Sequence, residues 1–290
     1  MSSPPATPGA ISSHDASAGP PTPRTPTATP TAAPDATAQP TPAATPSAVE
    51  LIEHCGGEPA SGLGGSSVQR DSTWAGFVAA RPPGTFNCVE AAWREPTVTC
   101  GAANAVVHVW VGIGGYTSVD LGIADNIHPI QMVGTGVECE DGVADHYAWH
   151  QVGPRQAYDV RFEPGRDGED LVVEPGDLVS AQIRFANGDF VMTVANLSSG
   201  DARSTTERGG GGYRSSAEWV VGGERGEPMA RFGTVTFIDG LCTMDGAVGP
   251  IGSKAWRRNR VDEWSGGARR LGVSALSNDG GSFEVAWYHR

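Results

Sequence analysis

The chain has 290 residues and a formal net charge of −13, from 20 basic and 33 acidic side chains. This excess of carboxylates disfavours nucleic acid and anionic membranes as partners, because both repel a negatively charged protein. No apolar run reaches the ~18 residues of a transmembrane helix, so we expect no membrane span.

The N-terminal stretch, to about Ser47, consists mainly of Pro, Ala, Thr and Ser and has almost no bulky apolar residue. Such a composition cannot bury enough surface to offset the entropy of the chain. We therefore predict a disordered tail and linker over residues 1–69 and one folded domain over 70–290. The apolar patch Val49–Ile52 fits either a helical turn of a pro-segment or part of the linker. The start of the chain lacks the basic and apolar regions of a signal peptide.

Beyond residue 70, short strand-like segments alternate with Gly, Pro, Asn and Asp, which predicts an all-β domain. The first of these segments cover residues 74–78, 86–93 and 105–111. Asn187-Gly188, between two alternating segments, predicts a tight hairpin. Residues 116–129 are expected to form a surface loop, and Gly209–Gly212 a flexible run.

The five cysteines are widely spaced and form no C-x-x-C pair, which argues against structural zinc. One or two disulfides and a leftover thiol would fit an exported protein. His146 and His150 have the i, i+4 spacing of a helical metal site, but on a strand they would lie ~13 Å apart, too far to chelate one ion. We expect no metal and no cofactor.

The segment Arg214–Val221, RSSAEWVV, alternates in a way typical of a strand. Ser216, Glu218 and Val220 would share one face, and Ala217, Trp219 and Val221 the other. Glu218 is then either an ordinary exposed carboxylate or an acid held on a rigid platform.

Several segments together resemble the glutamic peptidases of the eqolisin type, the peptidase G1 family. They are RSSAEWVV followed by ARFGTVTF, the pieces WAG, WREPTVTC and WVGIGG, the segment YAWHQ at 147–151, and the closing strands at 271–276 and 280–288. Their order and spacing match that family from about Trp74 to Trp287. The other hydrolase signatures sought, G-x-S-x-G, H-E-x-x-H and Asp-Thr-Gly, do not occur.

The resemblance implies a sandwich of two antiparallel sheets, lectin-like or jelly-roll-like, and an acid-active endopeptidase. Its substrates would be unfolded proteins or peptides, and the protein would be a secreted monomer. Glu218 would be the general base, and a Gln amide would position the water and stabilise the oxyanion. The rival is a catalytically silent, lectin-like sandwich that binds peptide or carbohydrate.

The position of the Gln is the main departure from the family pattern. Counting back from Gly134, the family's Gln falls on Met132, and Gln131 lies one residue earlier. Three alternatives are open: a bulge turns Gln131 into the site, Gln151 supplies the amide, or the amide is lost.

The expected catalytic residues are thus Glu218 and Gln131. The aromatic residues of the resembling segments, together with one amide, are expected to bind substrate: Trp74, Trp110, Tyr147, Trp149 and Gln151. Gly114 stands where the family often has Asp, which is a second departure.

Overall fold

The computed structural model describes residues 53–62, 64–81, 86–101, 104–116, 130–153, 160–162, 171–208, 214–224 and 227–288. All of them belong to one compact unit, Thr45–Arg290, and the other unit, Met1–Ala44, lies outside the described residues. The loop expected at 117–129 and the run Gly209–Gly212 also lie outside them. None of the described residues forms a helix with the length and hydropathy needed to cross a membrane.

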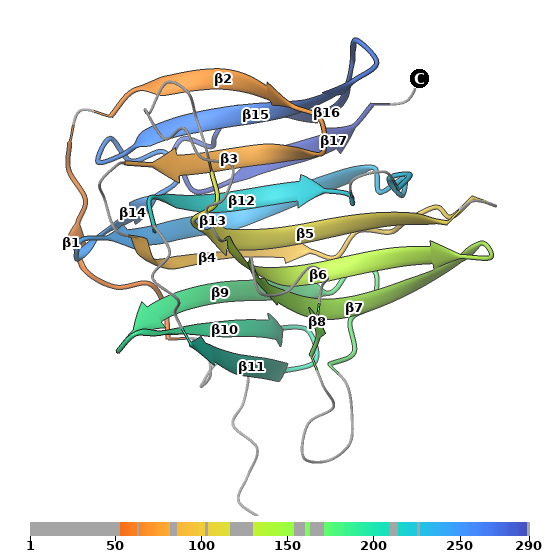
Figure 1. Ribbon diagram of the computed structural model, residues 1–290, viewed down its shortest axis with the longest axis horizontal. Helices are drawn as coiled ribbons and strands as arrows, with labels where there is room; N and C mark the ends of the chain where they lie inside the picture. The colour runs from red at the N-terminus through yellow and green to blue at the C-terminus, as the bar shows by residue number, and fades with distance from the viewer. Residues whose placement is uncertain are drawn as a thin grey trace, which may run out of the picture. The chain divides into compact units, whose positions relative to one another are not determined.

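Every regular element of the described ranges is a strand, and the strands form two layers packed face to face (Figure 1). This confirms the all-β sandwich. The first layer consists of eight strands in the order β2 (Ser66–Asp71), β15 (Arg257–Ser265), β3 (Trp74–Ala80), β12 (Ser216–Gly222), β5 (Ala105–Ile113), β6 (Gln131–Glu140), β7 (Val143–Val152) and β8 (Val160–Arg161).

The second layer lies behind the first in Figure 1. Its strands follow the order β16 (Ala268–Val273), β17 (Phe283–Trp287), β13 (Thr234–Met244), β4 (Phe86–Arg94), β9 (Leu178–Ala186), β10 (Asp189–Asn196) and β11 (Asp201–Arg208), and β14 (Ala247–Pro250) and β1 (Glu58–Pro59) extend from β13. The β15–β16 hairpin connects the layers. The pairings are antiparallel except for β1 with β14 and β2 with β15.

Two-residue turns with positive φ connect successive strands. Asn187 and Gly188, with φ of 55° and 91°, join β9 to β10, which confirms the expected hairpin. Asp141-Gly142 and Asp245-Gly246 turn the chain in the same way. Asn, Asp and Gly tolerate this left-handed region, and such turns match the twist of paired strands.

The main core lies between the layers and is rich in aromatic side chains. Trp219 of β12 is fully buried, and its Nε1 donates to the carbonyl oxygen of Glu90 in β4, 2.9 Å away. Phe77 of β3 packs edge-on against Phe283 of β17, with ring centroids 4.8 Å apart. These contacts assign one face of each first-layer strand to the core and leave the other face for a site.

The folded domain includes residues that composition alone placed in the linker. β1 pairs with β14, and β2 pairs with β15 over six residues. Cys55 is buried and forms a disulfide with Cys88. The boundary expected at 69/70 therefore falls inside a strand. The polar sequence of β2, SSVQRD, hid this strand because it lies at a sheet edge.

Two disulfides and one free thiol account for the five cysteines. Cys55 pairs with Cys88, Cys100 pairs with Cys139, and Cys242 is free and buried in the core. This confirms the expected combination, and both bridges tie strands or segments that are more than thirty residues apart in the chain.

These N-terminal contacts predict the effect of truncation. A chain that begins at Ser61 loses β1 and the Cys55–Cys88 bridge, and removing such a native disulfide typically costs about 2–5 kcal/mol. A chain that begins at Ala48 keeps both. We expect a clear drop in unfolding free energy for the first and none for the second, measured by chemical denaturation. Equal stability of the two chains would contradict a structural role for residues 53–60.

Candidate functional site

Glu218 lies on the face of β12 that points away from the main core. Its neighbours Ala217 and Trp219 are fully buried between the layers, so alternation directs Glu218 to the outer face of the first layer. The side chain is nevertheless only 4% exposed. Its Oε1 accepts a hydrogen bond from Ser216 Oγ at 3.1 Å. The expectation of a simple exposed carboxylate is therefore wrong, and the acid is held in place.

A row of paired residues crosses the sheet at Glu218. Glu218 is opposite Gly112 of β5, Gly112 is opposite Met132 of β6, and Met132 is opposite Gln151 of β7. Directly paired residues share a face. Gly112 has no side chain, and a Cβ there would lie 3.3 Å from Ile130 Cδ1 and 3.6 Å from the Cβ of Glu218. The Ile130 side chain thus lies over Gly112, and Glu218 and Met132 lie on the same face, two strands apart.

Gln131 is not on this face. It is 3% exposed and is opposite Ile113 and Val152, which both belong to the main core. The β5–β6 register runs without a break from Ala105–Cys139 to Ile113–Gln131, so no bulge rotates Gln131. The structure therefore does not form the expected Glu218–Gln131 pair, because a shift of one residue along a strand reverses the face.

A cavity of about 350 Å³ opens beside Glu218. Residues of β2, β3, β5, β6, β12 and β15, of the segment after β5 and of the position before β6 line it: Gln69, Arg70, Asp71, Trp74, Trp110, Gly115, Tyr116, Ile130, Met132, Glu218 and Val261. Trp74 and Tyr116 meet edge-on, with ring centroids 6.4 Å apart. Of the expected substrate-binding residues, Trp74 and Trp110 are brought to Glu218.

Tyr147 and Trp149 lie farther along the same sheet and do not line this cavity. Trp149 packs against Trp110 at a centroid distance of 6.2 Å, and Tyr147 lies 2.9 Å from His108, measured from its hydroxyl to Nε2. Gln151 shares the face of Met132 but is one strand farther from Glu218. These residues continue the surface beyond the cavity.

Sequence reasoning missed the wall formed by β2 and Tyr116. The Tyr116 hydroxyl donates to Gln69 Oε1 at 2.5 Å, and the Tyr116 amide donates to Ser216 Oγ at 3.4 Å. Tyr116 was expected to begin a surface loop, and Gln69 to end the linker. SSVQRD gave no signal for a strand, because Val68 is its one apolar residue and no apolar alternation is present.

Burial raises the pKa of Glu218 to about 8, while hydrogen bonds from Ser216 and from the Tyr116 backbone act in the opposite direction. Removal from water disfavours the charged form of a carboxyl group. Glu218 is therefore protonated in acidic and neutral solution. A protonated carboxyl has one O–H donor and an acceptor oxygen, so it can give and accept a proton at once.

The potential metal ligands that cluster among the described residues are Cys55, Cys88 and Glu90, but the two sulfurs are joined in a disulfide. His146 and His150 both lie on β7, which is a strand, so their i, i+4 spacing places them too far apart to chelate one ion. His146 Nδ1 instead lies 2.8 Å from Glu95 Oε1.

The two-layer β-sandwich is the fold of the glutamic peptidases of known structure. The sequence profile of the Peptidase A4 family matches residues 72–282, and this chain belongs to that family. A comparison with curated proteins gave no match.

Solved structures of the same fold support this assignment. Scytalido-glutamic peptidase, bound to a transition-state analogue, is 19% identical, with a TM-score of 0.60 over 75% of this chain and 99% of that one. Aspergilloglutamic peptidase from Aspergillus niger is 25% identical, with a TM-score of 0.50 over 63% and 99%. SCP-B, an eqolisin bound to the tripeptide Ala-Ile-His, is 19% identical, with a TM-score of 0.56.

The raised pKa makes stability depend on pH. Between the ordinary value of 4.5 and about 8, folded Glu218 keeps its proton while the unfolded chain releases it. Unfolding then releases a proton, so the unfolding free energy falls as pH rises through this window. Each pKa unit corresponds to about 1.4 kcal/mol, which gives a loss of a few kcal/mol.

Glu218→Gln should remove this fall in unfolding free energy with rising pH, because a neutral amide cannot ionise. Denaturant unfolding of both proteins between pH 4 and pH 9 measures it. Identical pH profiles for the two proteins would contradict a buried, protonated Glu218.

Proposed function

We propose that this protein is a glutamic endopeptidase of low intrinsic activity that works in acidic and in neutral solution, in which Glu218 transfers protons and the amide donor at position 132 is missing. The observation that carries the proposal is the row Glu218–Gly112–Met132, in which a thioether lies on the face of the carboxyl group, two strands away, and lines the same cavity. An extended peptide of an unfolded protein would lie in the cavity, against Trp74 and Trp110.

In the proposed reaction, neutral Glu218 acts as donor and acceptor together. Its O–H passes its proton to the oxygen of the scissile carbonyl while its other oxygen takes a proton from the attacking water, so the carboxyl group stays neutral. The tetrahedral gem-diol then collapses: the C–N bond breaks, the carboxyl group gives its proton to the leaving amine, and a hydroxyl of the intermediate returns a proton to the carboxylate as the new carbonyl forms. This differs from a mechanism that starts with an ionised general base, because the pKa of about 8 keeps Glu218 protonated in acid.

Met132 explains the low activity in this proposal. An amide at that position would donate a hydrogen bond to the developing oxyanion, whereas a methionine sulfur has no hydrogen to donate. Loss of one such donor typically lowers kcat by about 100- to 1000-fold. Gln151 lies one strand farther away and is not among the residues that line the cavity.

The same observation favours a second function, peptide binding without hydrolysis. A chain that retains the aromatic walls but lacks the amide would hold a peptide and release it intact. The two functions differ in one measurable respect, which is turnover of a bound peptide.

Secretion is also proposed, on the basis of the two disulfides. Such bridges form and persist in oxidising compartments. Cys55–Cys88 and Cys100–Cys139 both join distant parts of the fold, so the domain depends on that environment.

Restoring the amide tests the catalytic proposal. Met132→Gln should raise kcat on an unfolded protein substrate by roughly 100- to 1000-fold, while the apolar control Met132→Leu should leave it unchanged. Glu218→Gln in either background should abolish turnover. If Met132→Gln binds peptide as the wild type does and still releases it uncleaved, the protein is a binding module.

The pH profile tests the role of Glu218. With a protonated carboxyl as the active form, kcat/KM of Met132→Gln should be sustained in acid and fall about tenfold per pH unit above about 8. The measurement is an initial-rate series between pH 3 and pH 9.5. A rate that climbs from pH 4 towards pH 8 would instead identify ionised Glu218 as a general base.

A further inference from the structure

A second, larger cavity lies on the opposite face of the first layer. It has a volume of about 770 Å³, and none of its lining residues also lines the Glu218 cavity. Val261 of β15 lines the Glu218 cavity, whereas Arg258 and Arg260 of the same strand line the larger one. Alternation along β15 thus separates the two sites.

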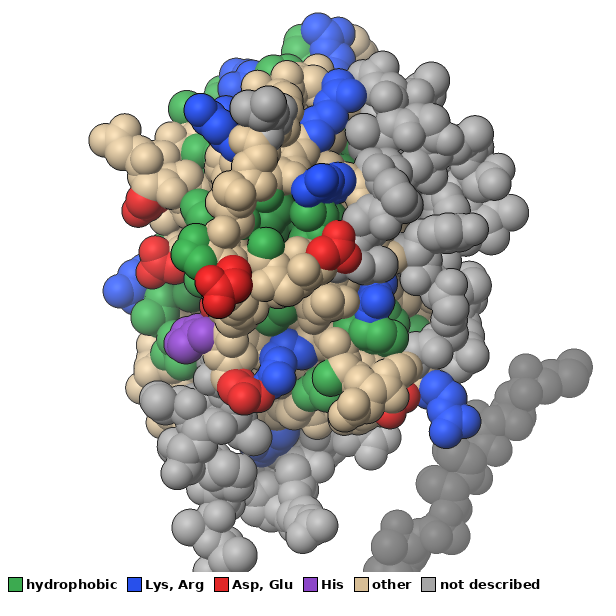
Figure 2. All heavy atoms as spheres, turned by 90° about the vertical axis from the view of Figure 1, so that its left-hand side faces the viewer, with side chains coloured by type: hydrophobic (Ala, Val, Ile, Leu, Met, Phe, Trp, Pro, Cys, Tyr) green, Lys and Arg blue, Asp and Glu red, His purple; other side chains and the backbone are tan. Residues whose placement is uncertain are grey.

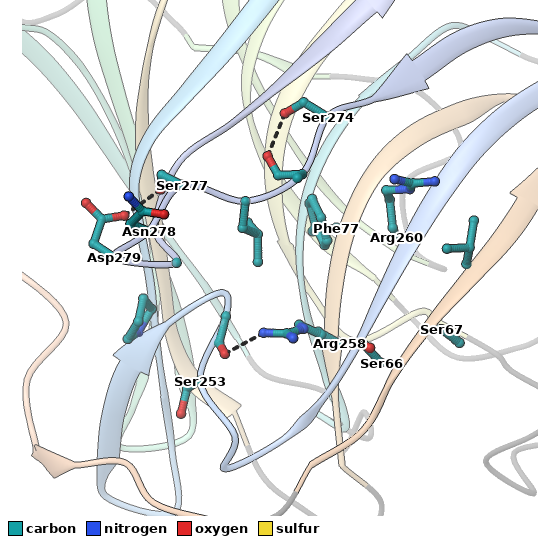
Figure 3. Close-up of a pocket in the computed structure, with 16 residues that line it drawn as sticks. Ser66, Ser67, Phe77, Ser253, Arg258, Arg260, Ser274, Ser277, Asn278 and Asp279 are labelled. Atoms are coloured by element: carbon teal, nitrogen blue, oxygen red, sulfur yellow. Dashed lines mark hydrogen bonds between the residues drawn. The ribbon is translucent and has the colours of Figure 1, made fainter.

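Two arginines of β15, Arg258 and Arg260, line this cavity (Figure 3). Arg258 Nη1 donates to the carbonyl oxygen of Gly252 at 2.8 Å, which fixes the orientation of that side chain. The Nε of Arg260 is closed off from solvent, whereas the side chain as a whole is about one-third exposed and its Nη2 lies 3.8 Å from Asp262. The terminal nitrogens of the two guanidinium groups are therefore the donors that an anionic ligand could meet.

The rest of the wall mixes polar groups with apolar side chains, the latter from Val68, Phe77, Pro250, Ala275 and Leu276. Serine hydroxyls surround the arginines, from Ser66, Ser67, Ser253, Ser274 and Ser277. Asn278 and Asp279 lie to the left of both arginines in Figure 3. Asp279 accepts hydrogen bonds from Ser277 and from the Gly281 amide, and is the one carboxylate among the lining residues.

This separation of groups gives the cavity two chemically different sides. The arginine side suits a carboxylate, which matches a guanidinium in shape and charge. The side with Asp279 and the serines suits hydroxyl groups, because a carboxylate accepts hydrogen bonds and repels an anion. A bare anion would satisfy the first side and leave the second side without donors.

On the face shown in Figure 2, Lys and Arg side chains gather in the upper part, and acidic and basic side chains mix below them. The whole chain nevertheless carries a charge of −13. Attraction of an anion would therefore depend on these two arginines rather than on a long-range field, which favours a small ligand over a polyanion.

We infer that this cavity is a binding site for a carboxylate-bearing sugar, a uronic acid or the acidic residue of a short oligosaccharide, with its carboxylate at Arg258 and Arg260 and its hydroxyls towards Asp279. The site is independent of the proposed hydrolysis at Glu218, since the two cavities share no residue. It would attach the protein to acidic polysaccharide.

Calorimetric titration of the full chain with D-glucuronate, and with glucose and inorganic sulfate as comparisons, tests this site. We expect glucuronate to bind in the millimolar range or tighter, and glucose and sulfate to bind at least about tenfold more weakly. Arg260→Gln should weaken glucuronate binding at least tenfold, since it removes charge-assisted hydrogen bonds. Arg231→Gln is the matched control, because Arg231 is exposed and lies outside the cavity.

Thermal melting of each variant separates loss of binding from loss of folding, and Arg258→Gln provides a second variant of the same cavity. Equal affinity of Arg260→Gln and Arg231→Gln for glucuronate would overturn the assignment. So would sulfate binding as tightly as glucuronate, which would leave no role for the hydroxyl side, or wild-type protein that binds no glucuronate at all.

Discussion

The position of Trp219 between the two layers is the constraint on which the site depends. The indole is fully buried, and its hydrogen bond to the Glu90 carbonyl joins β12 to β4 of the other layer. Once this residue is fixed in the core, the pleat of β12 directs its neighbour Glu218 to the opposite face. The carboxyl group is therefore placed by the same packing that stabilises the sandwich, and it has little freedom to move. A buried tryptophan in this position is worth several kcal/mol of core packing, which offsets the cost of burying an acid.

The parts of the fold that could be predicted are those in which local pattern and tertiary packing agree. The alternation of RSSAEWVV gave the correct faces for Glu218 and Trp219, and Asn187-Gly188 gave the correct turn. β2 could not be found in the same way, because an edge strand that is half exposed has no hydrophobic alternation of its own. Its stability comes from β15, which is about 190 residues away in the chain, as the pairing of Ser67 with Asn259 illustrates.

The sequence could predict the carboxyl group of the candidate site, Glu218, but not the residue that faces it. Glu218 sits inside a segment whose resemblance to the eqolisin peptidases is strong, whereas Gln131 lies next to a long loop that left its register open. Side chains alternate between the two faces of a strand, so a shift of one residue in the pairing reverses the face of each side chain. The unbroken β5–β6 register places Met132, and not Gln131, on the face of Glu218. Tyr116 and Gln69 were beyond sequence reasoning altogether, since their contact joins two segments that each looked like connecting chain.

The sequence of β11 has a consequence for the behaviour of the protein in concentrated solution. Within the described part of the chain, β11 pairs with β10 alone, so no described strand covers its outer edge. The strand reads DARSTTER and carries charges at Asp201, Arg203, Glu207 and Arg208. A second molecule that tried to extend the sheet there would have to desolvate these charges and pair them, and charged edge residues are a recognised barrier to such growth. The sandwich therefore ends at β11 rather than continuing into a neighbouring copy.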